Sequence, residues 1–177
     1  MAVNLPSPEA KDILSIKGIR LATTNAGIKK NGSSDLVLIE ICKGSTVSSI
    51  YTQNAFCAAP VTIAKKHQNE VTPRYLLVNS GNANAGTGEQ GLKTATACCE
   101  AMARQVNEIT EVVLPFSTGV IGEQLPLDKV KAAMPSLVAA LEAERWLDAA
   151  QGIMTTDTIA KAVSKQVKLA GKLITVT

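Results

Sequence analysis

The chain has 177 residues, 46% of them apolar and 3% aromatic, and its 18 basic and 15 acidic side chains give a formal net charge of +3. This length predicts a single domain over residues 1–177, with enough apolar surface for a core. Scarce aromatic rings and scattered lysines and arginines argue against nucleic acid or a membrane surface as a partner. No apolar run reaches membrane-spanning length and residues 1–6 lack a signal-peptide pattern, so we expect a cytoplasmic protein.

Early strands dominate the first half of the chain. Residues 13–26 have strand character and end in a turn at Asn25-Ala26-Gly27, and residues 35–41 form a nearly continuous apolar strand that we expect to be buried on both faces. A further strand is predicted over 46–52. The small apolar residues 54–64 suit a loop that feeds a short helix or strand, and 75–78 predicts another short buried strand.

Helices become prominent after residue 88. A helix is predicted over about 89–106, where Thr87 and Gln90 fit a capping box. A short buried strand over 112–114 comes next, and Pro126 opens another helix, in which Pro135 predicts a kink or a break. A short helix near 144–150 and two strands around Ala170-Gly171 complete the chain. Because strands and helices mix without strict alternation, the predicted fold class is α+β, with mixed α/β layers and a sheet packed against helices.

The sequence offers few groups for metal or nucleophilic chemistry. Its four cysteines are Cys42, Cys57, Cys98 and Cys99, and its one histidine is His67. Without a C-x-x-C pair or further histidines we expect no metal site, and we interpret the cysteines as buried, reduced thiols. His67 lies in the polar run 65–70, which predicts a solvated face. A Ser-His-Asp or Cys-His enzyme would depend on this one residue.

Residues 115–126 connect the predicted strand at 112–114 to the helix that follows. They contain a hydroxyl pair and two glycines, and the amides of Thr118 and Gly119 could stabilise the negative oxygen of an acyl-transfer intermediate. The alternative is an ordinary turn that uses glycine only for its conformational freedom.

A second glycine-rich loop precedes the helix at 89–106. Residues 86–91 satisfy G-x-G-x-x-G, a dinucleotide-binding pattern, but residues 79–85 separate it from the strand. Residues 79–88 could instead bind an anion or a polar substrate at the helix N-terminus, or they could form a structural turn in which the asparagines bond locally. A non-catalytic nucleotide-binding module is therefore one alternative function.

Several short motifs occur in order along the chain. They are Gly27-Ile28-Lys29 with Asp35-Leu36, Thr52-Gln53-Asn54, Ala58-Ala59-Pro60-Val61, Leu77-Val78-Asn79-Ser80-Gly81-Asn82-Ala83-Asn84-Ala85, Ser117-Thr118-Gly119-Val120-Ile121-Gly122 and Ile153-Met154-Thr155-Thr156-Asp157. Together, from about Gly18 to Thr177, the sequence resembles the N-terminal half of an ornithine acetyltransferase (glutamate N-acetyltransferase) of arginine biosynthesis.

The resemblance implies a precursor that cleaves itself before an internal threonine. That threonine heads the second (β) chain, accepts the acetyl group of N-acetylornithine and passes it to glutamate, with its own α-amine as base. The resemblance assigns Thr118 and Gly119 to the oxyanion hole and Thr155, with Thr156 beside it, to substrate binding. It implies no cofactor, leaves open acetyl-CoA as a co-substrate, and suggests an α2β2 heterotetramer.

The family's Lys-Gly-Ser-Gly stretch and its nucleophile are not among residues 1–177, and the final residues resemble a strand cut short. We therefore expect the native chain or its partner to continue beyond Thr177, and this chain alone to be inactive. The remaining alternative is a self-cleaving N-terminal-nucleophile amidohydrolase or aminopeptidase, in which water resolves the acyl-enzyme.

Overall fold

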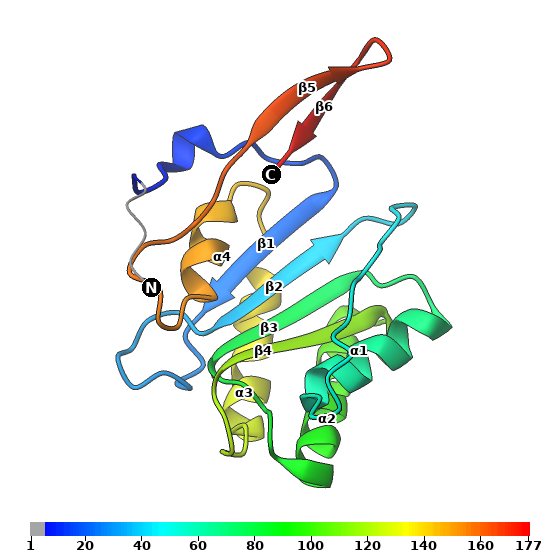
Figure 1. Ribbon diagram of the computed structural model, residues 1–177, viewed down its shortest axis with the longest axis vertical. Helices are drawn as coiled ribbons and strands as arrows, with labels where there is room; N and C mark the ends of the chain where they lie inside the picture. The colour runs from blue at the N-terminus through cyan, green and yellow to red at the C-terminus, as the bar shows by residue number, and fades with distance from the viewer. Residues whose placement is uncertain (1–5) are drawn as a thin grey trace.

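The computed structural model describes residues 6–177 and is built around a four-stranded sheet (Figure 1). In spatial order the strands are β1 (Ile19–Thr24), β2 (Leu36–Ile41), β3 (Tyr75–Asn82) and β4 (Val113–Val120). The pairs β1–β2 and β2–β3 are antiparallel, whereas β3 and β4 are parallel. A parallel pair needs a crossover connection, which helix α2 (Gly88–Val106) provides. The carboxyl ends of β3 and β4 therefore lie side by side.

Helices cover both faces of this sheet. Helices α1 (Ala59–Glu70), α2 and α3 (Leu127–Ala139) pack on one face, and α4 (Trp146–Gly152) packs on β1 and β2 from the other (Figure 1). Strand alternation explains the arrangement, because Leu36 and Leu38 join the core under the three helices while Val37 packs beside Ala149 of α4. The α+β class and the two-sided burial of residues 35–41 are thus confirmed.

The last two strands form a separate hairpin, β5 (Lys165–Leu169) and β6 (Lys172–Val176), which projects away from the main sheet (Figure 1). Its turn has φ values of 48° at Ala170 and 77° at Gly171, as a tight two-residue hairpin turn requires. This confirms the two strands predicted around Ala170-Gly171. Single turns of 3-10 helix lie at Ala10–Asp12 and Thr110–Val112.

Three predicted elements differ in the structure. Residues 46–52 are irregular, because they run along α1, where the side-chain amide of Gln68 bonds to Tyr51 and to the carbonyl of Val47. Helix α3 runs continuously through Pro135, so of the predicted kink or break the break is excluded. The capping box is also wrong, since the hydroxyl of Thr87 donates to Asn84 Oδ1 at 2.8 Å rather than to the helix.

His67 is buried, with 3% of its surface exposed, so the prediction of a solvated face is wrong. It lies one helical turn beyond Ile63 on the face of α1 that packs against β4. Its ring Nδ1 is 2.8 Å from the carbonyl oxygen of Val113, and because a carbonyl only accepts, Nδ1 carries the proton.

The cysteines divide into two pairs. Cys98 and Cys99 are buried in α2 as expected, and burial raises the pKa of the Cys98 thiol to about 12 and that of Cys99 further. Cys42 and Cys57 are exposed, against expectation. They lie in irregular segments outside the layers that the helices and the sheet bury.

Within residues 6–177, no helix has the length and apolar character that crossing a membrane would require.

Candidate active site

Thr118 and Gly119 lie near the carboxyl end of β4, directly beside β3. In the parallel register Ser80 pairs with Thr118, and Gly81 pairs with Gly119. The prediction of a turn for these residues is wrong, because the strand continues to Val120. Thr118 is half-buried and Gly119 is exposed, so this strand end is open to a ligand.

The two strand ends approach each other too closely for a side chain between them. A Cβ on Gly119, whose φ is 135°, would lie 2.4 Å from the carbonyl carbon of Gly81 and 2.5 Å from the nitrogen of Asn82. The register also shifts between Gly81 and Asn82, a bulge of the kind found beside active sites. Glycine at 119 is therefore a steric requirement of the fold as well as a candidate catalytic position.

The asparagine-rich carboxyl end of β3 is held by its own hydrogen bonds. Asn79 Nδ2 donates to the carbonyl of Asn82 at 2.7 Å, and Ser117 Oγ donates to Asn79 Oδ1 at 2.5 Å. Asn82 Nδ2 donates to the carbonyl of Glu123 at 3.0 Å, which ties this strand end to the loop after β4. The asparagines therefore bond locally, as the structural alternative for residues 79–88 expects, but residues 79–82 do so as the end of a strand and not as a turn. These bonds connect the end of β3 to β4 and to the loop that follows it.

Packing accounts for the last glycine of the G-x-G-x-x-G pattern. A Cβ on Gly91 would lie 1.9 Å from Thr87 Oγ1 and 2.6 Å from Asn84 Oδ1. The buried Asn84 side chain also donates to the carbonyl of Gly91 at 3.0 Å. This close packing gives the pattern a role without a nucleotide.

Thr155 is exposed and follows α4 by three residues. The carbonyl of Gly152, which ends α4, accepts hydrogen bonds from Ser80 Oγ at 2.5 Å and from Lys29 Nζ at 3.3 Å. Ser80 is the register partner of Thr118. The structure therefore anchors the segment that carries Thr155 at the same end of the sheet as Thr118 and Gly119.

The side chain of Asp157 lies just beyond Thr155 and pairs with Lys161. The hydrogen bond from Lys161 lowers the pKa of Asp157, so this carboxyl is ionised at neutral pH.

Lys29 and Asp35 form the part of this region to which sequence reasoning gave no role beyond the family motif. Asp35 is fully buried, and its carboxylate accepts the backbone N–H groups of Ala26 and Ile28, both at 2.6 Å, and of Lys29 at 2.8 Å. The loop thus places Lys29 over Gly81, where burial lowers the pKa of its ammonium group and the charge of Asp35 acts in the opposite direction. A charged residue directly before the apolar run Leu36–Ile39 was the signal for this arrangement.

The sequence's single histidine is engaged with the backbone, and the two buried thiols have raised pKa values. Neither forms an activated nucleophile–base pair. Residues 6–177 also contain no cluster of three or more His, Cys, Asp or Glu side chains placed to bind a metal ion.

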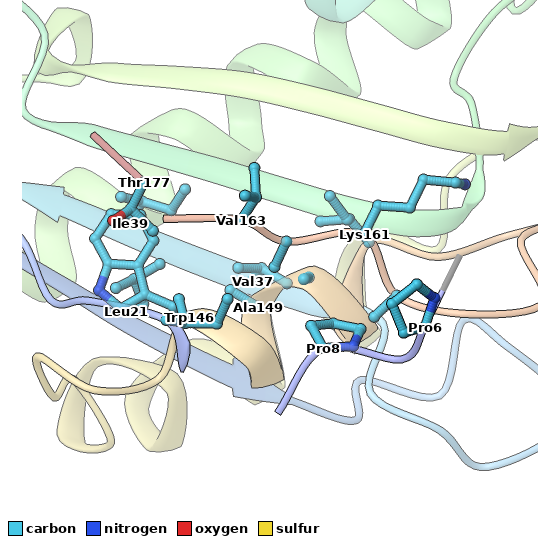
Figure 2. A pocket seen from close by; sticks show the side chains of 15 residues that line it. Pro6, Pro8, Leu21, Val37, Ile39, Trp146, Ala149, Lys161, Val163 and Thr177 are labelled. Atoms are coloured by element: carbon cyan, nitrogen blue, oxygen red, sulfur yellow. The ribbon is translucent and has the colours of Figure 1, made fainter. Parts of the chain in front are cut away.

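A large apolar cavity of about 650 Å³ lies on the opposite face of the sheet from α1–α3. Figure 2 shows Leu21 and Val37 from the sheet beneath it, with Trp146, Val163 and Thr177 around it. Its lining is apolar and comes from segments far apart in the chain. This composition suits an apolar partner surface better than a small charged substrate.

Comparison with known proteins places these features in a family. The ArgJ family model matches residues 20–177. The chain is 51% identical over 175 residues to the arginine biosynthesis bifunctional protein ArgJ of Methylococcus capsulatus, covering 96% of this chain and 43% of the relative. It is 47% identical over 188 residues to the ArgJ protein of Colwellia psychrerythraea, covering 100% of this chain and 44% of that relative. The chain therefore spans less than half the length of these relatives.

Solved structures agree. The ornithine acetyltransferase of Mycobacterium tuberculosis, crystallised with ornithine, superposes with a TM-score of 0.80 at 32% identity, covering 91% of this chain and 86% of that one. The ArgJ protein of Bacillus halodurans gives a TM-score of 0.82 at 31% identity, covering 97% and 90%. Both sequence and fold therefore lead to one conclusion, that the chain belongs to the ArgJ family of arginine biosynthesis.

Proposed function

We propose that this chain is the α chain of a glutamate N-acetyltransferase and supplies its oxyanion-stabilising groups. The observation that carries the proposal is the pairing of Ser80-Gly81 with Thr118-Gly119 at the open ends of two parallel strands. The Mycobacterium tuberculosis relative is an ornithine acetyltransferase crystallised with ornithine, which supports the substrate class.

In the proposed reaction, the threonine hydroxyl of a β chain attacks the acetyl carbonyl of N-acetylornithine. The threonine's own α-amine takes the proton, and Thr118 and Gly119 donate hydrogen bonds to the oxygen that becomes negative. Collapse of this intermediate breaks the amide C–N bond, the amine leaves protonated as ornithine, and the acetyl group stays on threonine. The uncharged amine of glutamate then attacks the acetyl ester through a similar intermediate, the ester C–O bond breaks, the α-amine of the threonine moves the proton from the attacking nitrogen to the departing threonine oxygen, and acetylglutamate leaves.

Two features support a second polypeptide. The β5–β6 hairpin exposes aliphatic side chains, with Leu169 at 64% and Leu173 at 66% exposure, and an isolated two-stranded ribbon is only marginally stable in water. The apolar cavity beside α4 offers a further unfilled surface (Figure 2). The relatives are more than twice as long as this chain, which supplies a candidate for the partner. We infer that such a β chain packs here, within an α2β2 heterotetramer in the cytoplasm.

The test is a product assay on the protein purified with everything that accompanies it. With N-acetylornithine and glutamate we expect acetylglutamate and ornithine in equal amounts, and a co-purifying fragment whose first residue is threonine. Free acetate without acetylglutamate would indicate an amidohydrolase instead. Acetyl transfer by material that holds no threonine-headed fragment would contradict the two-chain mechanism.

A second donor is tested in the same assay by replacing N-acetylornithine with acetyl-CoA. Acetylglutamate formation would extend the proposal to acetylglutamate synthesis, and its absence would restrict the enzyme to acetyl recycling. We propose no bound cofactor for either reaction.

A further inference from the structure

Two side chains, one from β3 and one from the loop between β1 and β2, converge on one carbonyl oxygen, that of Gly152. Ser80 Oγ donates to it at 2.5 Å and Lys29 Nζ at 3.3 Å. Ser80 is 1% exposed, and its backbone N–H is also fixed, by the carbonyl of Asp35 at 2.9 Å. The two donors therefore hold the end of α4 against the sheet through hydrogen bonds to a single acceptor.

Lys29 is held in place from both ends. Its backbone N–H donates to the carboxylate of Asp35 at 2.8 Å, and its Nζ also donates to the carbonyl of Ser34 at 3.0 Å. Its stem crosses Gly81, where a Cβ would lie 3.0 Å from Lys29 Cγ. An ammonium group at the C-terminus of α4 also meets the negative end of the helix dipole.

Gly152 leaves the end of α4 little freedom against the sheet. A Cβ there would lie 2.6 Å from Val37 Cγ2, so the helix end sits directly on β2. The chain then makes one turn, in which the N–H of Met154 donates to the carbonyl of Gln151 at 3.2 Å, and Thr155 follows. The position of Thr155 thus depends on where the Gly152 carbonyl is held.

We propose that Ser80 and Lys29 are positioning residues that fix the Thr155 segment at the end of the strand bearing Thr118. The inference rests on the proposed function for its kinetic consequences, but the contact itself does not. Because Ser80 pairs with Thr118 in the sheet, one residue links the oxyanion-stabilising strand to the substrate-binding segment. Neither Ser80 nor Lys29 needs to touch the substrate.

The kinetic test uses the complete enzyme with Ser80→Ala, Lys29→Met and Lys29→Arg. If each lost bond misplaces Thr155, the KM for N-acetylornithine rises about tenfold in the first two variants, while kcat changes less than about threefold. Lys29→Arg, which keeps a charged donor, restores KM to within about threefold of the parent.

Matched controls exist for both changes. Ser136→Ala removes a hydroxyl that donates to the carbonyl of Ala133 within α3, and Lys93→Met removes an exposed ammonium group that pairs with Glu89 at 3.0 Å within α2. Neither contacts Gly152, so both should keep the parent KM.

A double-mutant comparison separates positioning from general destabilisation. If Ser80 acts through Thr155, Ser80→Ala raises KM less than about twofold when Thr155→Ala is already present. If the two KM effects multiply in full, the positioning role is refuted.

Hydrogen exchange tests the contact without any assay of activity. The amides of residues 153–157 should exchange about tenfold faster in Ser80→Ala and Lys29→Met than in the two controls. Lys29→Met keeps the apolar stem over Gly81, so it answers the question even if Ser80→Ala does not fold. Unchanged exchange in a folded variant overturns the inference. Faster exchange in a protein that transfers no acetyl group would instead keep the contact and reject the proposed function.

Discussion

The carboxyl ends of β3 and β4 differ from the β5–β6 hairpin in which side chains they bury and which they expose. At the strand ends, Asn79, Asn82 and Ser80 are buried and each bonds to a neighbouring segment of the same chain. On the hairpin, aliphatic residues such as Leu173 are exposed. The buried polar side chains of the first region are paired within this chain, whereas the hairpin exposes aliphatic side chains of the kind that another polypeptide covers. Mutations of buried or closely packed residues at the strand ends should therefore affect folding, and mutations of exposed aliphatic residues on the hairpin should affect association.

The largest effect is expected from Gly119→Ala. A methyl group 2.4 Å from the carbonyl carbon of Gly81 forces β3 and β4 apart, and the cost should be about 3 kcal/mol in the free energy of unfolding. Urea unfolding measures this value. Gly122→Ala is the control, since its φ of 84° is strained but no atom lies within 4 Å of the added methyl, and it should cost about 1 kcal/mol. Equal costs in the two variants would contradict the close approach.

Thr118→Ala should act on turnover rather than on folding. The donor that this variant removes is the Thr118 hydroxyl, because alanine keeps the backbone amide, and its loss lowers kcat by roughly 10²–10³-fold. The half-buried side chain leaves the free energy of unfolding within about 1 kcal/mol of the parent. Steady-state acetylglutamate formation by the complete enzyme measures the first, and Thr46→Ala, in the exposed loop after β2, is the control. Turnover close to that of the parent would show that the Thr118 hydroxyl is not a donor in the oxyanion hole.

Leu173→Ser tests the prediction that the β5–β6 hairpin contributes to association. Because this side chain is 66% exposed, the stability of the chain itself should change by less than about 0.5 kcal/mol. Association with a second polypeptide should weaken about tenfold if the hairpin is covered by it. Titration of separated chains, followed by size-exclusion chromatography, provides the measurement, and Lys172→Ser on the same strand is the control. Unchanged association would place the partner elsewhere.

The smallest effect concerns Glu40, at the opposite end of the sheet from the candidate site. Burial acts to raise the pKa of Glu40, but the hydrogen bond and charge of Arg20, with the Tyr75 hydroxyl and Arg74, outweigh it and hold the pKa below its ordinary 4.5. A carboxyl with a depressed folded-state pKa stabilises the fold above its unfolded value, and this contribution disappears as the pH falls from 4.5 through the folded value.

Glu40→Gln should therefore lower stability by about 0.5–1 kcal/mol at pH 7 and flatten the loss of stability below pH 4.5, with no effect on kcat. Urea unfolding as a function of pH checks this. A steeper acid-side loss in the variant than in the parent would reverse the sign of the argument.

The layers were predictable from the sequence because apolar periodicity marks them, as at β2 and α2. The polar ends of β3 and β4 were not, since Asn79-Ser80-Gly81 and Ser117-Thr118-Gly119 each have turn composition. They are strands because they pair with each other, a contact between residues far apart in sequence. The strand predicted over 46–52 fails for the converse reason, as the segment lies along α1 instead of in the sheet.

At the candidate site, the family resemblance identified Thr118, Gly119 and Thr155, and the catalytic role of the first two and the substrate-binding role of Thr155 stay predictions. Residue spacing could not find Ser80 or Lys29, because their common acceptor, the Gly152 carbonyl, is a backbone atom. His67 could have been placed correctly, since it follows the buried Ile63 by one helical turn. The surrounding lysines masked that periodicity.

The crossover through α2 determines the order in which the strands of this chain pair during folding. β3 and β4 can meet only after the intervening helix has closed a loop, and the Gly152 contact must then wait for α4, whereas β5 and β6 join neighbours across a two-residue turn. During synthesis from the N-terminus, we expect the sheet to assemble before the hairpin emerges. The β5–β6 hairpin, with its exposed aliphatic side chains, would then emerge when the four-stranded sheet has already formed. This order limits incorrect pairing of β5 or β6 with strands of an incomplete sheet.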